Sequence, residues 1–514
     1  MRKFLVVSLI CLTALVTGSC NRNSGAADTS AGGQQTLSYW MPFVANASTL
    51  MKSWDDNVVW QHKEKVTGVK VNFISPAIGD ETVAFNLLLS SNDLPDLIQI
   101  HSGGFSYGYP GGPSKAVADG VFLRLNELIA KNAPNFTRVI DSNPDFKRQV
   151  MTDDGLLWGM GMLETVAQTN PWGPTIREDW LQDLGLAAPV TVADWRNVLT
   201  QFKQKKGAVA PWVMGGSGLA PCFVWAYDIS DGGWLQRDNK VVYSFTDPGF
   251  LEYLTEMNRW YKEGLIPQDF QSGELNSMLT DGVSGAYQQG FWMFAIDQNM
   301  IREKDPKAVI GPVAIPVKAA GSTTKLRDIQ TNNRGMETVV TSSCKDPDMA
   351  VKWLDWNYSD EGYYWNNFGE EGFSYNMVNG EPVWTDFMTK NPDGFDLNFL
   401  MNKYSMQMGS YVRDWQAIFV AYPPAANLTL TLWDGDSSHK LQTGLLSFTA
   451  DEGSTNASIM SDINTYVSEM TVKFITGQEP LGNWNTYVRN INNMGIADVL
   501  KNYQTAYDRY LNRK

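Results

Sequence analysis

The chain has 514 residues, 43% of them hydrophobic, and a formal net charge of −14 at pH 7. A single hydrophobic core rarely organises so long a chain, so we expect two lobes or domains. The acidic balance argues against nucleic acid and against anionic lipid headgroups as partners.

The N-terminus has the order of a secretory signal. Arg2 and Lys3 precede a mostly apolar run from Phe4 to Val16. Such a run is too short to cross a bilayer as a helix, and a positive start followed by an apolar stretch is typical of an export signal. We therefore expect residues 1–19 to be a signal peptide rather than part of the fold.

A cysteine stands where the signal is expected to end. Cys20 follows the small residues 17–19, a pattern that resembles the lipobox of bacterial lipoproteins, although Thr17 stands where that motif usually has Leu. Residues 20–35 are rich in Gly, Ser, Ala, Asn and Gln, which favours a flexible tether. We expect a lipid anchor on Cys20; an ordinary cleaved signal is the alternative.

Beyond the tether, strand and helix patterns alternate. Runs rich in β-branched residues indicate strands, and apolar residues at helical spacing indicate helices. The expected elements are a strand at 37–41, a helix at 48–67, a strand at 69–74, a helix beginning at Asp80 and a strand at 96–100. This order predicts parallel strands joined by right-handed crossovers, as in α/β proteins.

Helix ends are well marked further along the chain. Asp247 and Asp346 stand as expected caps, each directly before a proline at the first helical position. Gly264 follows the last turn of the first of these helices, and residues 191–194 form a capping-box pattern. These signals predict helices that begin at defined residues.

Aromatic side chains are numerous, whereas cysteine is scarce. The chain has 19 Trp, 20 Tyr and 23 Phe. Most of these rings must pack in cores, but rings on loops also suit the apolar faces of sugars. In the body only Cys222 and Cys344 remain, and they either pair in an oxidising compartment or stay as buried thiols.

Six segments between about residues 37 and 510 carry one family's motifs in the same order. NDLPDLIQI at 92–100 is similar to a Gly-Asp-x-Pro-Asp motif, with Asn92 in place of Gly, and TIREDWLQDLGLAAPVTVADW at 175–195 is similar to Arg-x-Asp-Trp-Leu-x-x-Leu-Gly. The other similar segments are GVFLRLNELIAKNAPNF at 120–136, WYKEGLIPQDF at 260–270, NNFGEEGFSYNMVNGEPVWTD at 366–386 and KFITGQEPLGNWNTYVRNINNMGI at 473–496. Together they resemble the extracellular solute-binding proteins of bacterial carbohydrate ABC importers, in particular the long lipoprotein subgroup.

The resemblance implies an α/β fold with two lobes, of the periplasmic-binding-protein type (type II). Each lobe would be an open, mostly parallel sheet flanked by helices, with a hinge between the lobes and the ligand in the cleft. By the family's pattern, lobe 1 would comprise residues 36–158 and 293–340, and lobe 2 residues 159–292 and 341–514.

The resemblance also implies a function. We expect a monomeric receptor that captures a carbohydrate, in particular an oligosaccharide, and delivers it to the permease subunits of an ABC importer. No cofactor is expected, and the membrane is contacted through the lipid on Cys20. Many relatives carry an EF-hand-like calcium loop after the helix that begins near 191–195. Here residues 201–212 have lysines and one glycine where carboxylates are needed, so we expect no metal.

Candidate ligand contacts follow strand ends, where open α/β sheets bind ligands. Trp40 and His101 meet this condition, and Trp158 lies where the family has a loop entering the hinge. A core position for Trp40 and a local hydrogen bond for His101 are the alternatives. Arg177 is suited to bind sugar hydroxyls or a uronate carboxylate, or to form an ion pair within its lobe.

The resemblance adds aromatic contacts. The segments GGW, with Gly233 and Trp234, and GFW, with Trp292, are similar to two places where sugar-binding relatives put backbone and a stacking Trp in the cleft. Trp365 and Glu371 in YWNNFGEEGF are further candidates, although clustered aromatic residues usually pack together.

A glycoside hydrolase is the alternative function, because such an enzyme would also be exported and would also be rich in aromatic residues. It needs two carboxyl groups about 5 to 10 Å apart. The acidic doublets at 153–154 and 370–371 are no evidence for this, since adjacent side chains diverge in strands. GGSGLA at 215–220 lacks the closing glycine of a nucleophile elbow, and the sequence has no phosphate loop or metal-ligand spacing. We therefore expect a binding protein, not an enzyme.

Overall fold

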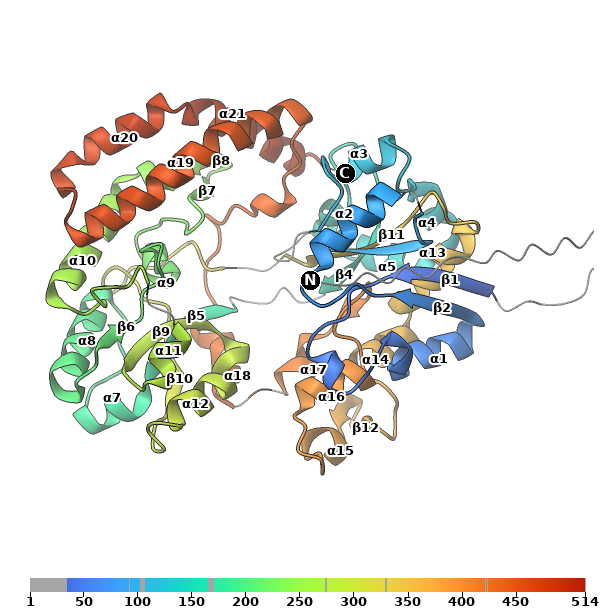
Figure 1. Cartoon of the computed structure of the whole chain (residues 1–514), viewed down its shortest axis with the longest axis horizontal. Coiled ribbons are helices and arrows are strands. Elements are labelled where there is room, and N and C mark those ends of the chain that lie inside the picture. Colours follow the sequence, from blue (N-terminus) through green and yellow to red (C-terminus); the bar gives the residue numbers. More distant parts are fainter. Residues whose placement is uncertain are drawn as a thin grey trace, which may run out of the picture.

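The computed structural model of the chain describes residues 35–91, 93–101, 107–164, 171–272, 275–328, 331–420, 422 and 424–513. These residues form two lobes that lie side by side, each with its own sheet and covering helices (Figure 1). The export signal, Cys20 and the tether as far as residue 34 lie outside the described residues. Within the described part, no helix is long and apolar enough to span a membrane.

Lobe 1 is built on a six-stranded sheet with the order β14-β4-β11-β3-β1-β2. The strands are β1 (Gln35–Trp40), β2 (Val69–Ile74), β3 (Leu97–His101), β4 (Met160–Glu164), β11 (Asn333–Val340) and β14 (Val412–Arg413). β1 runs parallel to β2 and β3, whereas β11 runs antiparallel to β3 and β4. The ends of β1 and β3 and the start of β11 therefore lie toward the same edge of the sheet.

Helices cover both faces of this sheet. One face packs against α2 (Glu81–Ser91) and α3 (Gly112–Ala118). The opposite face packs against α1 (Val58–Thr67), α4 (Asn126–Asn132), α5 (Pro134–Asp141), α6 (Pro144–Val150) and α13 (Pro347–Asp355). A smaller cluster joins α14 (Asp360–Phe368), β12 (Tyr375–Val378), β13 (Glu381–Trp384), α15 (Asp386–Thr389), α16 (Leu397–Tyr404) and α17 (Trp415–Phe419).

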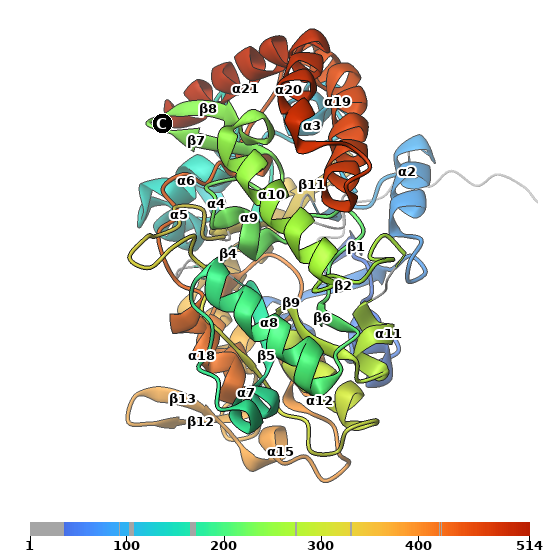
Figure 2. The same cartoon turned by 90° about the vertical axis from the view of Figure 1, so that its left-hand side faces the viewer.

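Lobe 2 has a four-stranded sheet with the order β10-β5-β9-β6. Its strands are β5 (Trp172–Arg177), β6 (Ala210–Trp212), β9 (Ser284–Gly290) and β10 (Ile310–Pro312), and β7 (Trp234–Arg237) pairs with β8 (Lys240–Tyr243) as a separate hairpin. The helices are α7 (Glu178–Leu184), α8 (Val192–Lys206), α9 (Pro221–Trp225), α10 (Pro248–Glu263), α11 (Leu275–Thr280), α12 (Phe294–Arg302) and α18 (Pro424–Leu432). The last three helices, α19 (Ala450–Thr476), α20 (Trp484–Asn493) and α21 (Ile496–Leu511), pack over α10 and β8 at one end of the lobe (Figure 2).

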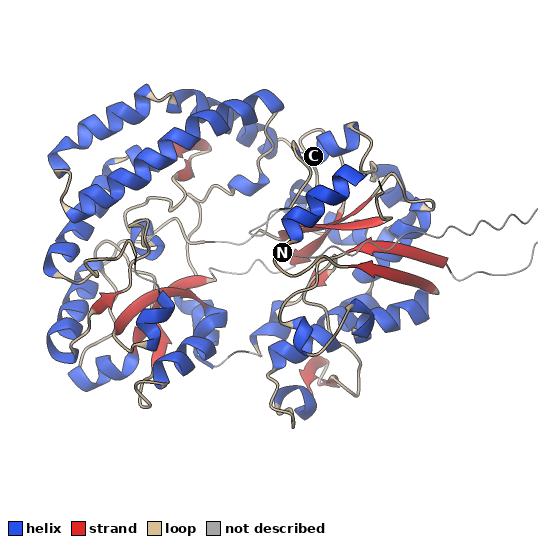
Figure 3. Cartoon of the chain, in the orientation of Figure 1, coloured by secondary structure: helices blue, strands red, loops and turns tan. Residues whose placement is uncertain are grey.

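The two-lobed α/β class is confirmed, but strand pairing divides the chain differently from the expected boundaries. β4 joins the sheet of lobe 1, so that lobe extends to residue 164. β10 pairs with β5, which places residues 293–328 in lobe 2. α13 packs in the core of lobe 1 and brings residues 341–418 with it, whereas Phe419 packs in the core of lobe 2. The two sheets stand apart (Figure 3), and among the described strands the second sheet has one parallel pair, β6 with β9, rather than mostly parallel pairs.

Local side-chain bonds explain where the helices begin. The capping box at 191–194 starts α8, and Asp346 caps α13 with its side chain, as expected. Asp247 precedes α10 but does not cap it with its side chain, because its carboxylate lies 2.6 Å from Nη1 of Arg237. The first expected helix is shorter than predicted, since Asn57 caps α1 and only two short 3-10 turns precede it.

The two remaining cysteines lie in different cores. Cys222 is buried in the core of lobe 2 and Cys344 in the core of lobe 1, and both are free thiols. The buried-thiol alternative is therefore confirmed, and no disulfide links the lobes through these residues.

Candidate ligand-binding site

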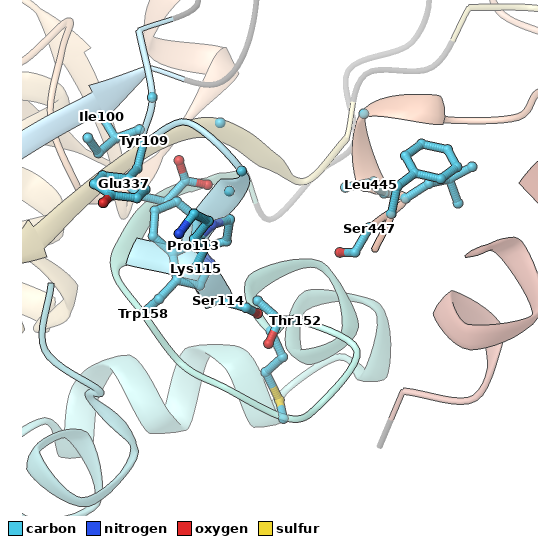
Figure 4. A pocket seen from close by; sticks show the side chains of 18 of the residues that line it. Ile100, Tyr109, Pro113, Ser114, Lys115, Thr152, Trp158, Glu337, Leu445 and Ser447 are labelled. Atoms are coloured by element: carbon cyan, nitrogen blue, oxygen red, sulfur yellow. The ribbon is translucent and has the colours of Figure 1, made fainter. Parts of the chain in front are cut away.

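A cavity of about 1090 Å³ lies between the lobes. Its lobe 1 wall includes segment 108–115, Trp158 and the start of β11, and its lobe 2 wall is segment 444–449, which precedes α19 (Figure 4). Polar lining side chains include Lys115, Gln149, Thr152, Asn333, Arg334, Glu337, Ser447 and Arg513. Its size lies at the upper end for small-molecule pockets, which suits an extended ligand with several hydrogen-bonding groups.

Glu337 faces this cavity from β11. Between Asn333 and Glu337 the register of β11 against β4 shifts, and Gly335 takes a left-handed conformation with φ of 69°. A bulge of this kind re-aims the side chains that follow it. Glu337 is 5% exposed, and its Oε1 accepts a hydrogen bond of 3.0 Å from the side-chain amide of Asn333. The cavity therefore holds a nearly buried carboxylate in a fixed position.

Tyr109 and Lys115 line the cavity and share one carboxylate. The hydroxyl of Tyr109 donates to Oδ2 of Asp119 over 2.7 Å, and Nζ of Lys115 lies 2.7 Å from the same oxygen. The hydrogen bonds from Lys115 and Tyr109 lower the pKa of Asp119, and the bond to Asp119 raises the pKa of Lys115. Both side chains are thus held against the wall of lobe 1.

Arg334 pairs with a buried carboxylate where the chain leaves lobe 1. Its Nε lies 3.1 Å from Oε1 of Glu164, the last residue of β4. Burial raises the pKa of Glu164, an effect that Arg334 and Arg413 oppose, and burial lowers the pKa of Arg334. The ion pair lies directly before the passage of the chain into lobe 2, beside the expected hinge.

The end of α21 ties lobe 2 to lobe 1 next to the cavity. Nε of Arg509 and Nε of Arg513 lie 3.0 and 2.6 Å from the two carboxylate oxygens of Asp153 in lobe 1. Arg509 also pairs with Glu452 at the start of α19, and Arg513 donates to Oγ of Ser447 over 2.9 Å. These bonds position the lobe 2 wall of the cavity relative to lobe 1.

Among the residues proposed as ligand contacts, Trp158 lines this cavity. Trp40 and His101 lie at their expected strand ends but are buried, which places them in the packing of lobe 1. Trp40 is 3% exposed, and its ring lies 5.7 Å from Phe85 of α2 and 5.4 Å from Tyr107. His101 is paired through its backbone with Tyr107. Trp40 therefore occupies a core position, which was the alternative to ligand contact, because α2 covers this end of the sheet.

Arg177, Gly233 and Trp234 lie within lobe 2 and away from the cavity lining. Arg177 is 1% exposed and forms ion pairs of 2.6 and 2.5 Å with Asp179 and Asp305. Trp234 is buried and stacks on Tyr503 of α21 with ring centroids 3.9 Å apart. Gly233 supports the same hairpin with a left-handed φ of 80°. The structure gives these three residues packing roles.

Trp292 lies in the turn after β9 and pairs with a ring that the sequence did not single out. Its ring meets Trp172 edge to face with centroids 4.9 Å apart. Trp172 begins β5 directly after the passage from lobe 1, opposite Gly290, and is 37% exposed. The pair thus occupies the end of the second sheet nearest to lobe 1 (Figure 1). It does not belong to the lining of the cavity.

Trp365 and Glu371 lie on the outer part of lobe 1, in α14 and the loop after it. Trp365 stacks on His62 of α1 with ring centroids 3.6 Å apart. Glu371 is exposed and joins Tyr375 in a backbone bridge. Neither residue lines the cavity. The aromatic packing of α14 against α1 holds this segment away from it.

Sequence reasoning missed Tyr109, Glu337 and segment 444–449. Tyr109 follows β3 and meets the strand-end condition that selected His101, so this residue was within reach of that argument. Glu337 lies inside a strand, and only the bulge in β11 turns it to the cavity. Segment 444–449 carries no motif; it reaches the cavity because Arg509 of α21 and Arg513 after it bind Ser447.

Metal-ligating groups do not gather in the described part of the chain. Within it, no three or more His, Cys, Asp or Glu side chains come together in a way that would hold a metal ion. At the position of the EF-hand-like loop of many relatives, α8 ends in Lys203, Lys205 and Lys206, and Gly207 closes it.

A model of the family described as bacterial extracellular solute-binding protein matches residues 47–364. This match covers more than half of the chain and includes both lobes. The chain belongs to this family. The family is one of binding proteins rather than enzymes.

Three relatives are similar over most of the chain. The fructooligosaccharide ABC transporter substrate-binding protein FusA of Streptococcus pneumoniae is 23% identical and covers 91% of this chain and 90% of its own length. Lipoprotein LipO of Bacillus subtilis is 25% identical over 72% of this chain and 73% of its own. The solved structure of FusA with kestose has a TM-score of 0.69 at 20% identity, covering 93% of this chain and 100% of its own. The solved structure of the alginate-binding protein AlgQ2 without calcium has a TM-score of 0.68 at 21% identity, covering 93% of this chain and 99% of its own. These structures establish the fold.

Proposed function

We propose that this protein is a receptor that captures an oligosaccharide between its lobes and delivers it to the permease of an ABC importer. The observation that carries the proposal is the interlobe cavity, with an aromatic ring at Trp158 and fixed hydrogen-bonding groups at Glu337 and Ser447. Sugars have apolar ring faces and many hydroxyls, which such a lining suits. The similarity to FusA, named for fructooligosaccharide, supports the ligand class.

The same proposal includes a location and a mode of action. The receptor would be exported and held at the membrane by a lipid on Cys20, in the periplasm or at the outer face of the cytoplasmic membrane, and it would be active as a monomer. The similarity to a protein named as a lipoprotein supports the anchor. A flexible tether at 20–35 would raise the concentration of the receptor near its permease without fixing its orientation. It would bind its ligand without chemical change.

A thermal-shift screen of the mature chain against mono- and oligosaccharides tests this function. A ligand that binds the folded state raises the melting temperature by mass action. We expect at least one oligosaccharide to do so and to be recovered unchanged by chromatography. Recovery of a cleaved sugar would establish a glycoside hydrolase instead, and a panel without any stabilising saccharide would contradict carbohydrate capture.

A further inference from the structure

We propose that the cavity selects an uncharged oligosaccharide over an acidic one, and that Glu337 and Trp158 form the subsite that enforces this choice. The inference rests on the proposed function and goes beyond it, since the family similarity includes a protein named for alginate, a polyuronate, and one named for fructooligosaccharide. The charge of the ligand must therefore be argued from the residues of this chain.

Each basic side chain of the described cavity lining already has an acidic partner in the protein. Lys115 lies 2.7 Å from Asp119. Arg334 lies 3.1 Å from Glu164. Because these carboxylates are fixed next to their cations, they compete with any carboxylate on a ligand.

Arg513 completes this set on the other side of the cavity. Its side chain is 4% exposed, and its Nε lies 2.6 Å from Asp153. Its Nη1 donates to the carbonyl of Arg148, and its Nη2 donates to the carbonyl of Leu445 and the hydroxyl of Ser447. A ligand carboxylate would have to displace these internal bonds to reach the guanidinium, and would gain little from the exchange.

Glu337 adds a negative charge that faces the ligand space. Its Oε1 accepts a hydrogen bond from the side-chain amide of Asn333, and the side chain is nearly buried. Carboxylate oxygens accept hydrogen bonds from two sugar hydroxyls well. A uronate at the same place would bring two like charges together in a poorly solvated site, which is unfavourable.

Trp158 supplies the apolar surface beside this carboxylate. The ring is half-buried and packs against the cluster that contains Ile100 and Phe122, so one orientation is held. Figure 4 shows Trp158 and Glu337 on the lobe 1 wall, opposite Leu445 and Ser447 of lobe 2. A sugar ring stacked on Trp158 would therefore present its edge hydroxyls to Glu337 and the lobe 2 wall.

Titration calorimetry with matched ligands tests this inference. The panel contains neutral fructo-, gluco- and galacto-oligosaccharides and oligouronates of equal length, among them oligogalacturonate as the free acid and as its methyl ester. We expect the tightest ligand to be neutral, and the methyl ester to bind more tightly than the free acid wherever that backbone binds. An oligouronate as the tightest ligand would overturn the inference and leave carbohydrate capture intact. A panel without any binder would overturn both.

Variants assign the selectivity to the subsite. Glu337→Gln is expected to weaken the affinity for the neutral ligand at least tenfold. It should also reduce the preference for neutral over acidic ligands. Glu371→Gln, an exposed carboxylate outside the cavity, is the control and should leave both affinities within twofold. An unchanged preference in Glu337→Gln, with an unchanged melting temperature, would overturn the role of this carboxylate.

A second variant keeps the test decisive if Glu337→Gln does not fold. Lys115 is 55% exposed, so Lys115→Met should fold normally. Because we expect no ligand carboxylate to bind this ammonium, the ratio between the affinities for the methyl ester and for the free acid should stay within threefold of its value in the unaltered protein. A loss of tenfold or more that is confined to the free acid would show that Lys115 holds an acidic group of the ligand, and would overturn the inference.

Discussion

The carboxyl group of Asp297 is buried, and burial disfavours its charged form. It is 1% exposed in lobe 2, and burial raises its pKa to about 6. In an unfolded chain the pKa of Asp is about 3.9, so the folded state binds this proton more tightly. The stability that this protonated group contributes is present below pH about 4 and is lost as the pH rises through about 6.

We therefore expect Asp297→Asn to raise the free energy of unfolding at pH 8 by roughly 1 to 3 kcal/mol and to change it little at pH 4. Urea unfolding followed by tryptophan fluorescence at the two pH values measures this difference. Asp281→Asn, which alters an exposed carboxyl of the same lobe, is the control. An equal gain at both pH values would show that the titration of Asp297 is not its cause.

Trp158 and Trp40 show how position separates two rings of the same kind. Trp158→Ala should cost roughly 1 to 3 kcal/mol of ligand binding with a small effect on folding, because the ring lines the cavity. Trp40→Ala should instead cost about 3 to 5 kcal/mol of folding stability, because the ring is enclosed by Phe85 and Tyr107. Calorimetric binding and thermal unfolding of both variants check the contrast; the reverse assignment would mean that Trp40 reaches the ligand.

At the scale of elements, the β7–β8 hairpin depends on one glycine. Gly233 has a φ of 80°, and a Cβ there would lie 2.8 Å from the ring of Tyr243 and 2.9 Å from that of Phe245. We expect the strain in Gly233→Ala to lower the free energy of unfolding by about 1 to 3 kcal/mol, and therefore to lower the melting temperature. The ligand affinity of the folded fraction should stay unchanged. Gly232→Ala, where a Cβ meets open space, is the matched control. A loss of affinity without a loss of stability would return Gly233 to the ligand site.

The end of α21 is a second element whose role is testable. Asp153 accepts bonds from both Arg509 and Arg513 across the lobes. Asp153→Asn removes the charge that holds them, which should lower the free energy of local opening by about 1 to 3 kcal/mol. Faster hydrogen exchange in residues 148–154 and at the end of α21 is the expected measurement.

Asp145 provides the comparison for this contact. Its carboxylate pairs with Arg148 over 3.0 Å but is 57% exposed. Such surface pairs contribute little, so Asp145→Asn should change hydrogen exchange only locally and by less than about 1 kcal/mol. Equal effects of Asp145→Asn and Asp153→Asn would mean that the bond across the lobes has no special role.

At the scale of the whole molecule, the lipid anchor decides where the receptor acts. Cys20→Ser removes the thiol that would carry the lipid, so the protein should move from the membrane fraction to the soluble fraction with its ligand affinity unchanged. Fractionation and labelling with a lipid precursor measure this. Cys11→Ser, within the expected signal peptide, is the control and should stay in the membrane fraction. Unchanged labelling of Cys20→Ser would contradict the anchor.

Much of the secondary structure of this protein could be predicted from the sequence alone, because it depends on local interactions. The strand predicted at 96–100, observed as β3 at Leu97–His101, and the capping box at 191–194 depend on neighbouring residues, so their pattern was sufficient to predict them. The family motifs also lie in short local segments, and their resemblance predicted the two lobes. The buried state of Arg177 was open at that level, because a buried and an exposed arginine have the same neighbours in sequence.

Only the tertiary structure decided which residues meet between the lobes. β10 follows α12 in sequence but pairs with β5, so strand pairing rather than order assigns it to lobe 2. Trp40 ends β1 and Trp158 lies just before β4, and the packing of α2 over Trp40 separates core from cavity. Asp153 and Arg513 lie 360 positions apart in the chain and meet because two cores, each built from distant segments, bring their surfaces together. Local sequence determines where an element begins and ends, whereas the long-range packing of cores determines which of its residues are buried and which face a ligand.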